Sequence, residues 1–351
     1  MGQNKKKEGN SMKKYGKSLL AFGLAMVLIG STTACSMKKG SNGENDTAQG
    51  KEQIMFVLDW TPNTNHTGVY VAQEKGYFEE AGLDVKIVQP PEDGAEALVA
   101  TGKAQFGVSF QDTLAPTYAT DSPLPITAVA AIIQHNTSGI LSRKGEGIDV
   151  PKGMENHKYA TWDGMIETAM IQNVVEEDGG DYSKVEMIPS TVTDEYSALQ
   201  SKQVDCLWVY YAWAGMATKV KGLETDYFAF KDINPVFDYY TPVIIGNDIY
   251  LEEHEDTAKA FLHAVKKGYE YAMENPEDAA KILVKQVPEL DEEIAIASQQ
   301  WLVDQYQAEA KYWGYIDADR WNAFYEWVSK EGLVEGTIPN NIGFTNKYLT
   351  E

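Results

Sequence analysis

Aromatic and amide side chains gather in the turn that follows the first strand predicted by the sequence, at residues 54–58. The turn reads Asp59-Trp60-Thr61-Pro62-Asn63-Thr64-Asn65-His66 and leads into a helical stretch that contains Tyr70. The indole of Trp60 supplies a flat apolar face. The two asparagines and His66 supply hydrogen-bond donors and acceptors, so the turn suits a flat heterocycle with polar edges. In the alternative, Asn63 and Asn65 form an Asx turn and a helix cap while Trp60 fills the core.

Three more predicted strands end in residues of the same kinds. They cover residues 106–110, 159–161 and 206–209, and the candidate binding residues after them are Gln111, Asp112, Trp162, Asp163, Glu167, Tyr210, Tyr211 and Trp213. Backbone amides at the helix start after Asp163 could hold a carbonyl oxygen, although the Asp163 carboxylate opposes a fully charged anion. Ser109 and Asp112 could instead be helix caps, and core packing explains Trp208 equally well.

Strands and helices alternate along the chain from residue 54 onward. Further strands are expected at residues 85–88, 126–133 and 185–188, and the helices between strands at 68–74, 95–100, 113–119, 164–177 and 195–201. This alternation predicts parallel β-α-β units with right-handed crossovers. Open sheets of this kind bind ligands at the carboxyl ends of their strands, which is where the four turns would lie.

The predicted fold class is α/β, with two lobes, a hinge and a ligand cleft between the lobes. Residues 53–137 are interpreted as the first part of lobe 1 and residues 138–240 as lobe 2. An apolar run at 243–245 and helices expected at 257–274, 276–285, 292–306 and 319–331 would return residues 241–351 to lobe 1. The chain would then cross between the lobes twice, near residues 135–138 and 239–241.

The first 34 residues are typical of a lipoprotein signal peptide. Basic residues precede an uncharged run at 18–31, which is too short to span a bilayer comfortably. Thr32-Thr33-Ala34-Cys35 follows and resembles a lipobox with Thr in place of the usual Leu, so Cys35 is the expected lipidation site. Residues 35–52 would form a flexible tether. An ordinary free thiol at Cys35 and a start at Met12 are the alternatives left open.

Charge and residue types exclude several classes of function. The net charge of −22 becomes more negative once residues 1–34 are removed, which argues against nucleic acid as a partner. Beyond Cys35 the chain has only Cys206, so neither a disulfide nor a cysteine-based metal cluster is available. The histidines lie singly, at His66, His135, His157, His254 and His263, which does not favour a metal site.

Motifs of common enzymes are absent from the sequence. It contains no G-x-S-x-G elbow, no Walker loop, no G-x-G-x-x-G after a strand and no H-E-x-x-H. We therefore expect a binding protein without catalysis, cofactor or metal.

Four segments carry a resemblance to a known family: LDWTPNTNHTGVY at 58–70, AQEKGYFEEAGLDV at 72–85, GKAQFGVS at 102–109 and VDCLWVYYAW at 204–213. The chain resembles the periplasmic binding proteins and synthases for the thiamine pyrimidine precursor. They are a branch of the type II periplasmic binding protein fold that also includes sulfonate and nitrate binders. The synthases carry a cysteine-rich segment that this chain lacks. Ala214 stands where many pyrimidine binders have an acidic residue, which leaves the exact ligand open.

The resemblance implies an extracytoplasmic solute-binding lipoprotein of an ABC importer, held at the cell membrane by its lipid anchor. Its ligand would be a formylated or amino pyrimidine, or a similar small heteroaromatic. Its partners would be the permease subunits, and the protein would be a monomer. Riboflavin or an aliphatic sulfonate on the same fold is the alternative cargo, and a pyrimidine-precursor synthase is the alternative activity.

Overall fold

The computed structural model describes residues 51–92, 94–190 and 192–349. The predicted signal peptide, Cys35 and most of the predicted tether lie outside the described residues. Of the tether, Lys51 and Glu52 are described, and Glu52 is already the first residue of a strand.

The first sheet has the order β2-β1-β3-β10-β4. Its strands are β1 (Glu52–Val57), β2 (Leu83–Val88), β3 (Phe106–Ser109), β4 (Ile126–Ala131) and β10 (Val243–Asn247). Strand β1 pairs in parallel with β2 and β3, whereas β10 runs antiparallel between β3 and β4. β3, with residues FGVS, is buried throughout, as expected of a central strand covered on both faces.

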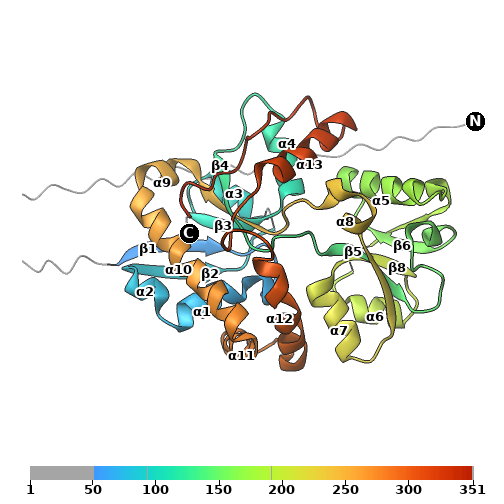
Figure 1. The fold of residues 1–351 in the computed structure, drawn as a ribbon, viewed down its shortest axis with the longest axis horizontal. Helices are drawn as coiled ribbons and strands as arrows, with labels where there is room; N and C mark the ends of the chain where they lie inside the picture. The colour runs from blue at the N-terminus through green and yellow to red at the C-terminus, as the bar shows by residue number, and fades with distance from the viewer. Residues whose placement is uncertain (1–50, 93, 191, 350–351) are drawn as a thin grey trace, which may run out of the picture. The chain divides into compact units, whose positions relative to one another are not determined.

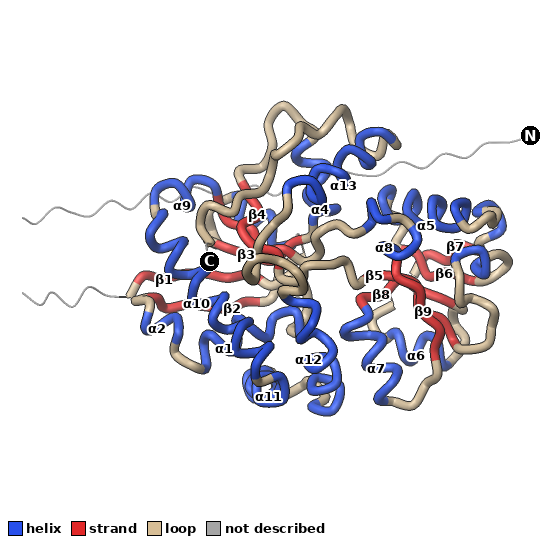
Figure 2. The backbone as a smooth tube through the Cα atoms, in the orientation of Figure 1, coloured by secondary structure: helices blue, strands red, loops and turns tan. Residues whose placement is uncertain are grey.

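The second sheet repeats this plan with the order β7-β6-β8-β5-β9. Its strands are β5 (Ser138–Arg143), β6 (Lys158–Thr161), β7 (Glu186–Pro189), β8 (Cys206–Tyr210) and β9 (Thr225–Ala229). Strand β6 pairs in parallel with β7 and β8, and β5 runs antiparallel to β8 and β9. Figure 2 shows the two groups of strands with helices around each. The predicted fold class is confirmed in these two mixed α/β sheets.

Helices connect the strands and cover the sheets (Figure 1). They are α1 (Thr67–Glu74), α2 (Tyr77–Glu80), α3 (Gly94–Ala100), α4 (Gln111–Tyr118), α5 (Met165–Glu177), α6 (Glu195–Gln200), α7 (Met216–Val220), α8 (Phe230–Ile233), α9 (Asp248–Glu253), α10 (Glu255–Glu274), α11 (Pro276–Gln286), α12 (Glu292–Tyr306) and α13 (Ala318–Lys330). Helix α10 packs on α1 at very close range, since a Cβ atom at Gly268 would lie 1.9 Å from the carbonyl oxygen of Gly68. The helices after β10 thus return to the first sheet.

Two segments connect the sheets, and both lie at the edges where the parallel strands of the sheets end. Residues 132–137 run from the carboxyl end of β4 to the start of β5, and residues 238–242 lead to the start of β10. Because β5 and β10 are the antiparallel strands, each begins at the edge where the parallel strands of its sheet end. The carboxyl edges of both sheets therefore meet these two crossing segments.

Within residues 51–92, 94–190 and 192–349, the structure contains no helix long and apolar enough to cross a membrane.

Candidate functional site

The two carboxyl edges touch at Tyr210, the last residue of β8. Its ring stacks on Phe110, which follows β3, with centroids 6.0 Å apart and an interplanar angle of 14°. Its hydroxyl lies 3.1 Å from Oγ1 of Thr241 in the second crossing segment. Ser138 is directly opposite Tyr210 in the antiparallel pair of β5 and β8, so both side chains face the same side of the sheet. We call this region, defined by Phe110, Asp112, Ser138, Tyr210 and Thr241, the junction.

Buried polar atoms at the junction lack hydrogen-bond partners among the described residues. They are Oδ1 of Asp112, Oγ of Ser138 and, two residues before Tyr210 on the same strand, Nε1 of Trp208. Most buried polar atoms in proteins are hydrogen-bonded, so an open acceptor, an open hydroxyl and an open donor in one region need a reason. A ligand with polar edges would satisfy them.

Asp112 supplies the carboxyl group of the junction. Burial raises the pKa of its carboxyl to about 6, against the backbone amides of Asp112 and Thr113, which lower it, and the charge of Glu96 adds to the rise. The same carboxyl acts on the neighbouring phenols. Burial first, and the Asp112 charge second, raise the pKa values of Tyr210 and Tyr239 above the ordinary value for a phenol.

The turn after β1 holds Trp60 outward. Trp60 is 60% exposed and does not fill the core. Asn63 does form the expected cap, because its side chain accepts from the Asn65 amide and its own amide donates to the His66 ring. His66 is fully buried, with Nε2 2.5 Å from Oδ1 of Asp59. The polar groups of this turn thus bind each other and present the indole to solvent.

Tyr70 and Gln111 lie in packed surroundings. Tyr70, on α1, is buried in the core of the first sheet, and burial raises the pKa of its phenol to about 12. Gln111 donates from Nε2 to the carbonyl of Trp321 at 2.8 Å and accepts from the Tyr240 amide at 2.9 Å. The backbone amide of Gln111 also donates to the Tyr240 carbonyl, so Gln111 binds the second crossing segment to the start of α4.

The turn after β6 separates an exposed ring from a buried carboxyl. Trp162 is 56% exposed and meets Trp208 edge to face at 5.3 Å. Glu167 is buried and accepts from the Tyr159 hydroxyl at 2.6 Å and from Thr161 Oγ1 at 3.0 Å. Burial raises the pKa of Glu167 despite these bonds. Asp163, between them in sequence, is exposed.

The turn after β8 is a single π-helical turn, η4 (Tyr211–Gly215). Tyr211 lies between Tyr227, at 4.5 Å, and Trp301 of α12, at 5.4 Å. It thus connects the second sheet with the C-terminal helices. Trp213 is half-buried on the same turn.

Several of the sequence-predicted residues therefore fall into three groups. Tyr210 and Asp112 lie together at the junction, and Trp60 and Trp162 project from strand ends of the two sheets. His66, Glu167 and Gln111 have their polar atoms bonded to protein groups. Sequence reasoning did not name Phe110, Ser138 and Thr241 as candidates. Ser138 and Thr241 lie in the predicted crossings between the lobes, and their position there could have pointed to them.

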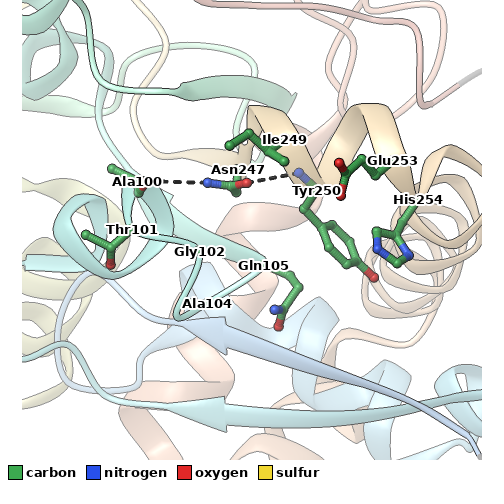
Figure 3. Close-up of a pocket in the computed structure, with 10 residues that line it drawn as sticks. All are labelled: Ala100, Thr101, Gly102, Ala104, Gln105, Asn247, Ile249, Tyr250, Glu253 and His254. Atoms are coloured by element: carbon green, nitrogen blue, oxygen red, sulfur yellow. Dashed lines mark hydrogen bonds between the residues drawn. The ribbon is translucent and has the colours of Figure 1, made fainter.

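A surface hollow of about 250 Å³ lies at the other end of the first sheet (Figure 3). It is bordered by residues before β3 and by the carboxyl end of the antiparallel strand β10. Asn247 donates there to the Val99 carbonyl and accepts from the Tyr250 amide, and the Tyr250 hydroxyl donates to Glu52. Since these polar groups already bond to one another, the hollow is a weaker candidate site. No group of three or more His, Cys, Asp or Glu side chains in the described ranges could hold a metal ion.

Comparison with known proteins identifies relatives of both binding and enzymatic types. The chain is 28% identical over 306 residues to a formylaminopyrimidine-binding protein of Halalkalibacterium halodurans, covering 84% of this chain and 90% of that one. It is 27% identical over 317 residues to a 4-amino-5-hydroxymethyl-2-methylpyrimidine phosphate synthase of Saccharomyces cerevisiae, covering 85% and 88%.

Solved structures support the fold. The ligand-binding component of an ABC-type import system from Staphylococcus aureus superposes with a TM-score of 0.61 at 15% identity, covering 85% of this chain and 98% of that one. The family model described as NMT1/THI5 like matches residues 63–279, which include the junction, both crossing segments and the turn after β1 from Asn63 onward. The chain therefore belongs to the NMT1/THI5-like family.

Proposed function

We propose that the chain is an extracytoplasmic solute-binding protein of an ABC importer and that its ligand is a thiamine pyrimidine precursor, a formylated or amino pyrimidine. The observation that carries this proposal is the junction. Buried polar atoms of Asp112 and Ser138 lack partners in the described residues at the edge where both sheets end, and so does Nε1 of Trp208 in the middle of β8. The relative from Halalkalibacterium halodurans supports the ligand class, because it is a formylaminopyrimidine-binding protein.

Exposed tryptophans supply the apolar part of the proposed site. Trp60 and Trp162 are both more than half exposed and follow strands of different sheets. A planar ring would stack on Trp60 or on the aromatic residues Tyr210 to Trp213, and offset stacking contributes about 0.5–1.5 kcal/mol beyond area burial. In this proposal Asn63, Asn65 and His66 shape the turn that holds Trp60, and Asp112 reads the polar edge of the ring.

Binding without catalysis is the second part of the proposal. Cys206 is fully buried on β8, and burial raises the pKa of its thiol far above the ordinary value. A thiol in that state is a poor nucleophile and a poor metal ligand. This supports a binding protein rather than a synthase, which is the activity named for the yeast relative.

An anionic cargo fits the junction less well. The side chains that define it include no Lys or Arg, and the Asp112 carboxylate would repel a sulfonate. Riboflavin and an aliphatic sulfonate remain the alternative ligands, and a binding test distinguishes them from a pyrimidine.

The anchoring and the domain limits are part of the same proposal. Cys35 would be acylated after removal of residues 1–34, and a tether ending near residue 52 would join it to the first lobe. Lobe 1 would comprise residues 53–137 and 241–351, lobe 2 residues 138–240, and ligand binding would close the two lobes about the crossing segments. The protein would act as a monomer with permease subunits at the membrane.

The test is to identify the ligand that the protein carries. Full-length protein purified in detergent under native conditions would be denatured, and the released small molecules identified by mass spectrometry. Titration calorimetry with amino pyrimidines, formylamino pyrimidines, riboflavin and aliphatic sulfonates would follow. A released pyrimidine with tight rebinding supports the proposal. Tight binding of a sulfonate with indifference to pyrimidines contradicts the ligand class.

A further inference from the structure

We propose that Asp112 determines which heteroaromatic the junction accepts, by pairing its carboxyl with a ring nitrogen and an adjacent exocyclic amino group, with one proton shared in the pair. This inference rests on the proposed function and adds the atom-level basis of its specificity.

The position of Asp112 leaves one oxygen open. Asp112 is the second residue of α4, which begins directly after β3 and Phe110. Oδ1 is closed off from solvent and has no hydrogen-bond partner within the described ranges. The backbone amides of Asp112 and Thr113 at the start of α4 lower the pKa of the carboxyl, but the N-cap of this helix is Phe110, so Asp112 is not its capping residue and Oδ1 has no bond within the described residues.

The surroundings of Asp112 contain acids and phenols rather than cations. After burial, the negative charge of Glu96 on α3 also raises the pKa of Asp112. Burial raises the pKa values of three nearby phenols, and the charge of Asp112 adds to the rise. They are Tyr210 of β8, Tyr239 of the second crossing segment and Tyr325 of α13. Glu96 itself accepts a bond from Ser109 Oγ. No Lys, Arg or His of the described residues forms an ion pair with Asp112. Nothing in the described residues supplies the missing partner of Oδ1, and in this proposal the ligand supplies it.

A ring nitrogen beside an amino group fits such a carboxyl. In this pairing the amino group donates to the open Oδ1, while a proton lies between the ring nitrogen and a remaining lone pair of Oδ2. The pair is then either a carboxylic acid with a neutral ring or a carboxylate with a protonated ring. Each of these forms contains one proton between the two groups. A sulfonate or phosphate offers only acceptors and a negative charge, and it would be rejected. The open Ser138 Oγ, opposite Tyr210, offers a further donor or acceptor to the same ligand.

The shared proton produces a definite dependence of binding on pH. The free carboxyl has a pKa of about 6. Above this value and above the ring pKa of the ligand, both partners lack the proton and binding must take one up, so affinity falls about tenfold per pH unit. Below both pKa values, both partners are protonated and one proton must leave, so affinity falls again. The affinity is therefore highest between the two pKa values.

Asp112→Asn separates this role from simple packing. An asparagine amide offers a donor and an acceptor at every pH, as it does when it pairs with the N7 and amino group of adenine. We expect Asp112→Asn to bind the neutral ligand without proton uptake, so that its affinity stays constant at high pH. Asp112→Leu, which offers no polar atom, should weaken binding at the optimal pH by at least tenfold.

The experiment is calorimetric titration of the full-length protein in detergent with 4-amino-5-hydroxymethyl-2-methylpyrimidine, the pyrimidine of the synthase name. It would be run across the pH range in buffers of different ionisation enthalpy, which reports the protons exchanged. Asp121→Asn, which removes an exposed carboxylate just beyond α4, is the matched control. Circular dichroism and thermal unfolding check that each variant is folded.

We expect uptake of about one proton per ligand at high pH in the wild type and in Asp121→Asn, and close to none in Asp112→Asn. The same pH profile and proton uptake in Asp112→Asn as in the wild type would overturn the role of Asp112 while leaving the pyrimidine-binding function intact. Wild-type affinity in a folded Asp112→Leu variant would overturn it as well. Failure of the wild type to bind any pyrimidine overturns the proposed function and this inference together.

Discussion

His66 lies between a carboxylate and a backbone amide in the turn that carries Trp60. Its Nε2 is 2.5 Å from Oδ1 of Asp59, and its Nδ1 is 3.1 Å from the backbone nitrogen of Asn63. Because the amide can only donate, Nδ1 must accept, and the ring proton is therefore on Nε2 and points at Asp59. The residue thus ties together both ends of the segment in which Trp60 projects.

Replacing His66 by alanine should destabilise the protein. The change leaves the half-buried Asp59 carboxylate and the Asn63 amide without partners, and each buried unsatisfied group costs about 1–3 kcal/mol. Urea unfolding followed by circular dichroism measures the loss. The control is His157→Ala, whose Nδ1 contacts only the Glu155 carbonyl, and it should cost much less. Equal stability of both variants would show that the His66 bonds do not hold the turn.

Replacing Trp60 by alanine should weaken ligand binding without changing stability. The indole is 60% exposed, so the folded state loses little packing when it is removed. Stacking and the burial of its face by a ligand together should account for at least a tenfold rise in Kd, since 1.4 kcal/mol is a factor of ten. Calorimetry with the ligand identified by mass spectrometry measures it.

Ile249→Ala is the control for the Trp60 variant. Ile249 is 59% exposed, similar to Trp60, but it lies by the hollow at the other end of the first sheet (Figure 3). It should leave both Kd and stability unchanged. A Trp60→Ala protein that binds as tightly as the wild type would remove Trp60 from the site.

The alternation of strands and helices was enough to predict most of the parallel part of each sheet. The antiparallel strand β5 and the edge strand β9 were not predicted. The residues of β5, SGILSR, do not alternate, yet all are buried. Arg143 is accommodated there by bonds to the Leu199 and Val204 carbonyls and to Asp205. At Gly139 a Cβ atom would lie 2.1 Å from the Phe228 carbonyl oxygen. Such pairings depend on tertiary contacts that hydrophobic periodicity does not report.

Residue type at a strand end was a partial guide to the candidate site. It pointed to Trp60, Asp112 and Tyr210, whose part in ligand binding stays a prediction, and it could not separate them from Glu167 and Gln111, whose polar atoms are bonded inside the protein. That distinction depends on which partners the fold brings within about 3 Å of each atom. Ser138 was missed for the same reason, because a serine in an unpredicted strand gives no signal by itself.

Replacing Cys35 by serine should release the protein from membranes. The basic and apolar leader before Cys35 motivates this expectation. The two or three acyl chains of a mature lipoprotein anchor firmly, whereas the polar tether alone has no affinity for lipid. Fractionation of cells that express each form, followed by immunoblotting, measures the distribution. Membrane association of the Cys35→Ser protein equal to that of the wild type would contradict the lipobox interpretation.

A network of charged groups binds the two crossing segments to each other. Nδ1 of His135 is 2.6 Å from Oδ2 of Asp238, and its Nε2 is 2.8 Å from Oε2 of Glu309. Asp238 also accepts from the Asn136 amide at 2.9 Å, and Arg320 of α13 donates to Glu309 at 3.0 Å. Both ring nitrogens of His135 face acceptors, so the doubly protonated imidazolium fits this position best.

Stability should therefore depend on pH through His135. The hydrogen bond to Asp238, and then the bond to Glu309, raise the pKa of His135 above its ordinary value of 6.5. A group whose native pKa is raised stabilises the native state fully below its unfolded pKa, and this contribution is lost as pH rises through the native pKa. His135→Gln should thus be less stable than the wild type below pH 6.5, and the difference should shrink as the pH rises above this ordinary value. Urea unfolding at several pH values measures it.

Asp238→Asn provides the control for this pH dependence. Without the Asp238 carboxylate the largest cause of the His135 shift is gone, so His135→Gln should have a smaller effect in that background, as in a double-mutant cycle. Glu309 does not complicate the comparison. Its pKa is lowered to about 2, chiefly by the bond from His135, so its own contribution is lost only in acid below the range tested. A stability difference between wild type and His135→Gln that does not shrink as the pH is raised above 6.5 would contradict this role of His135.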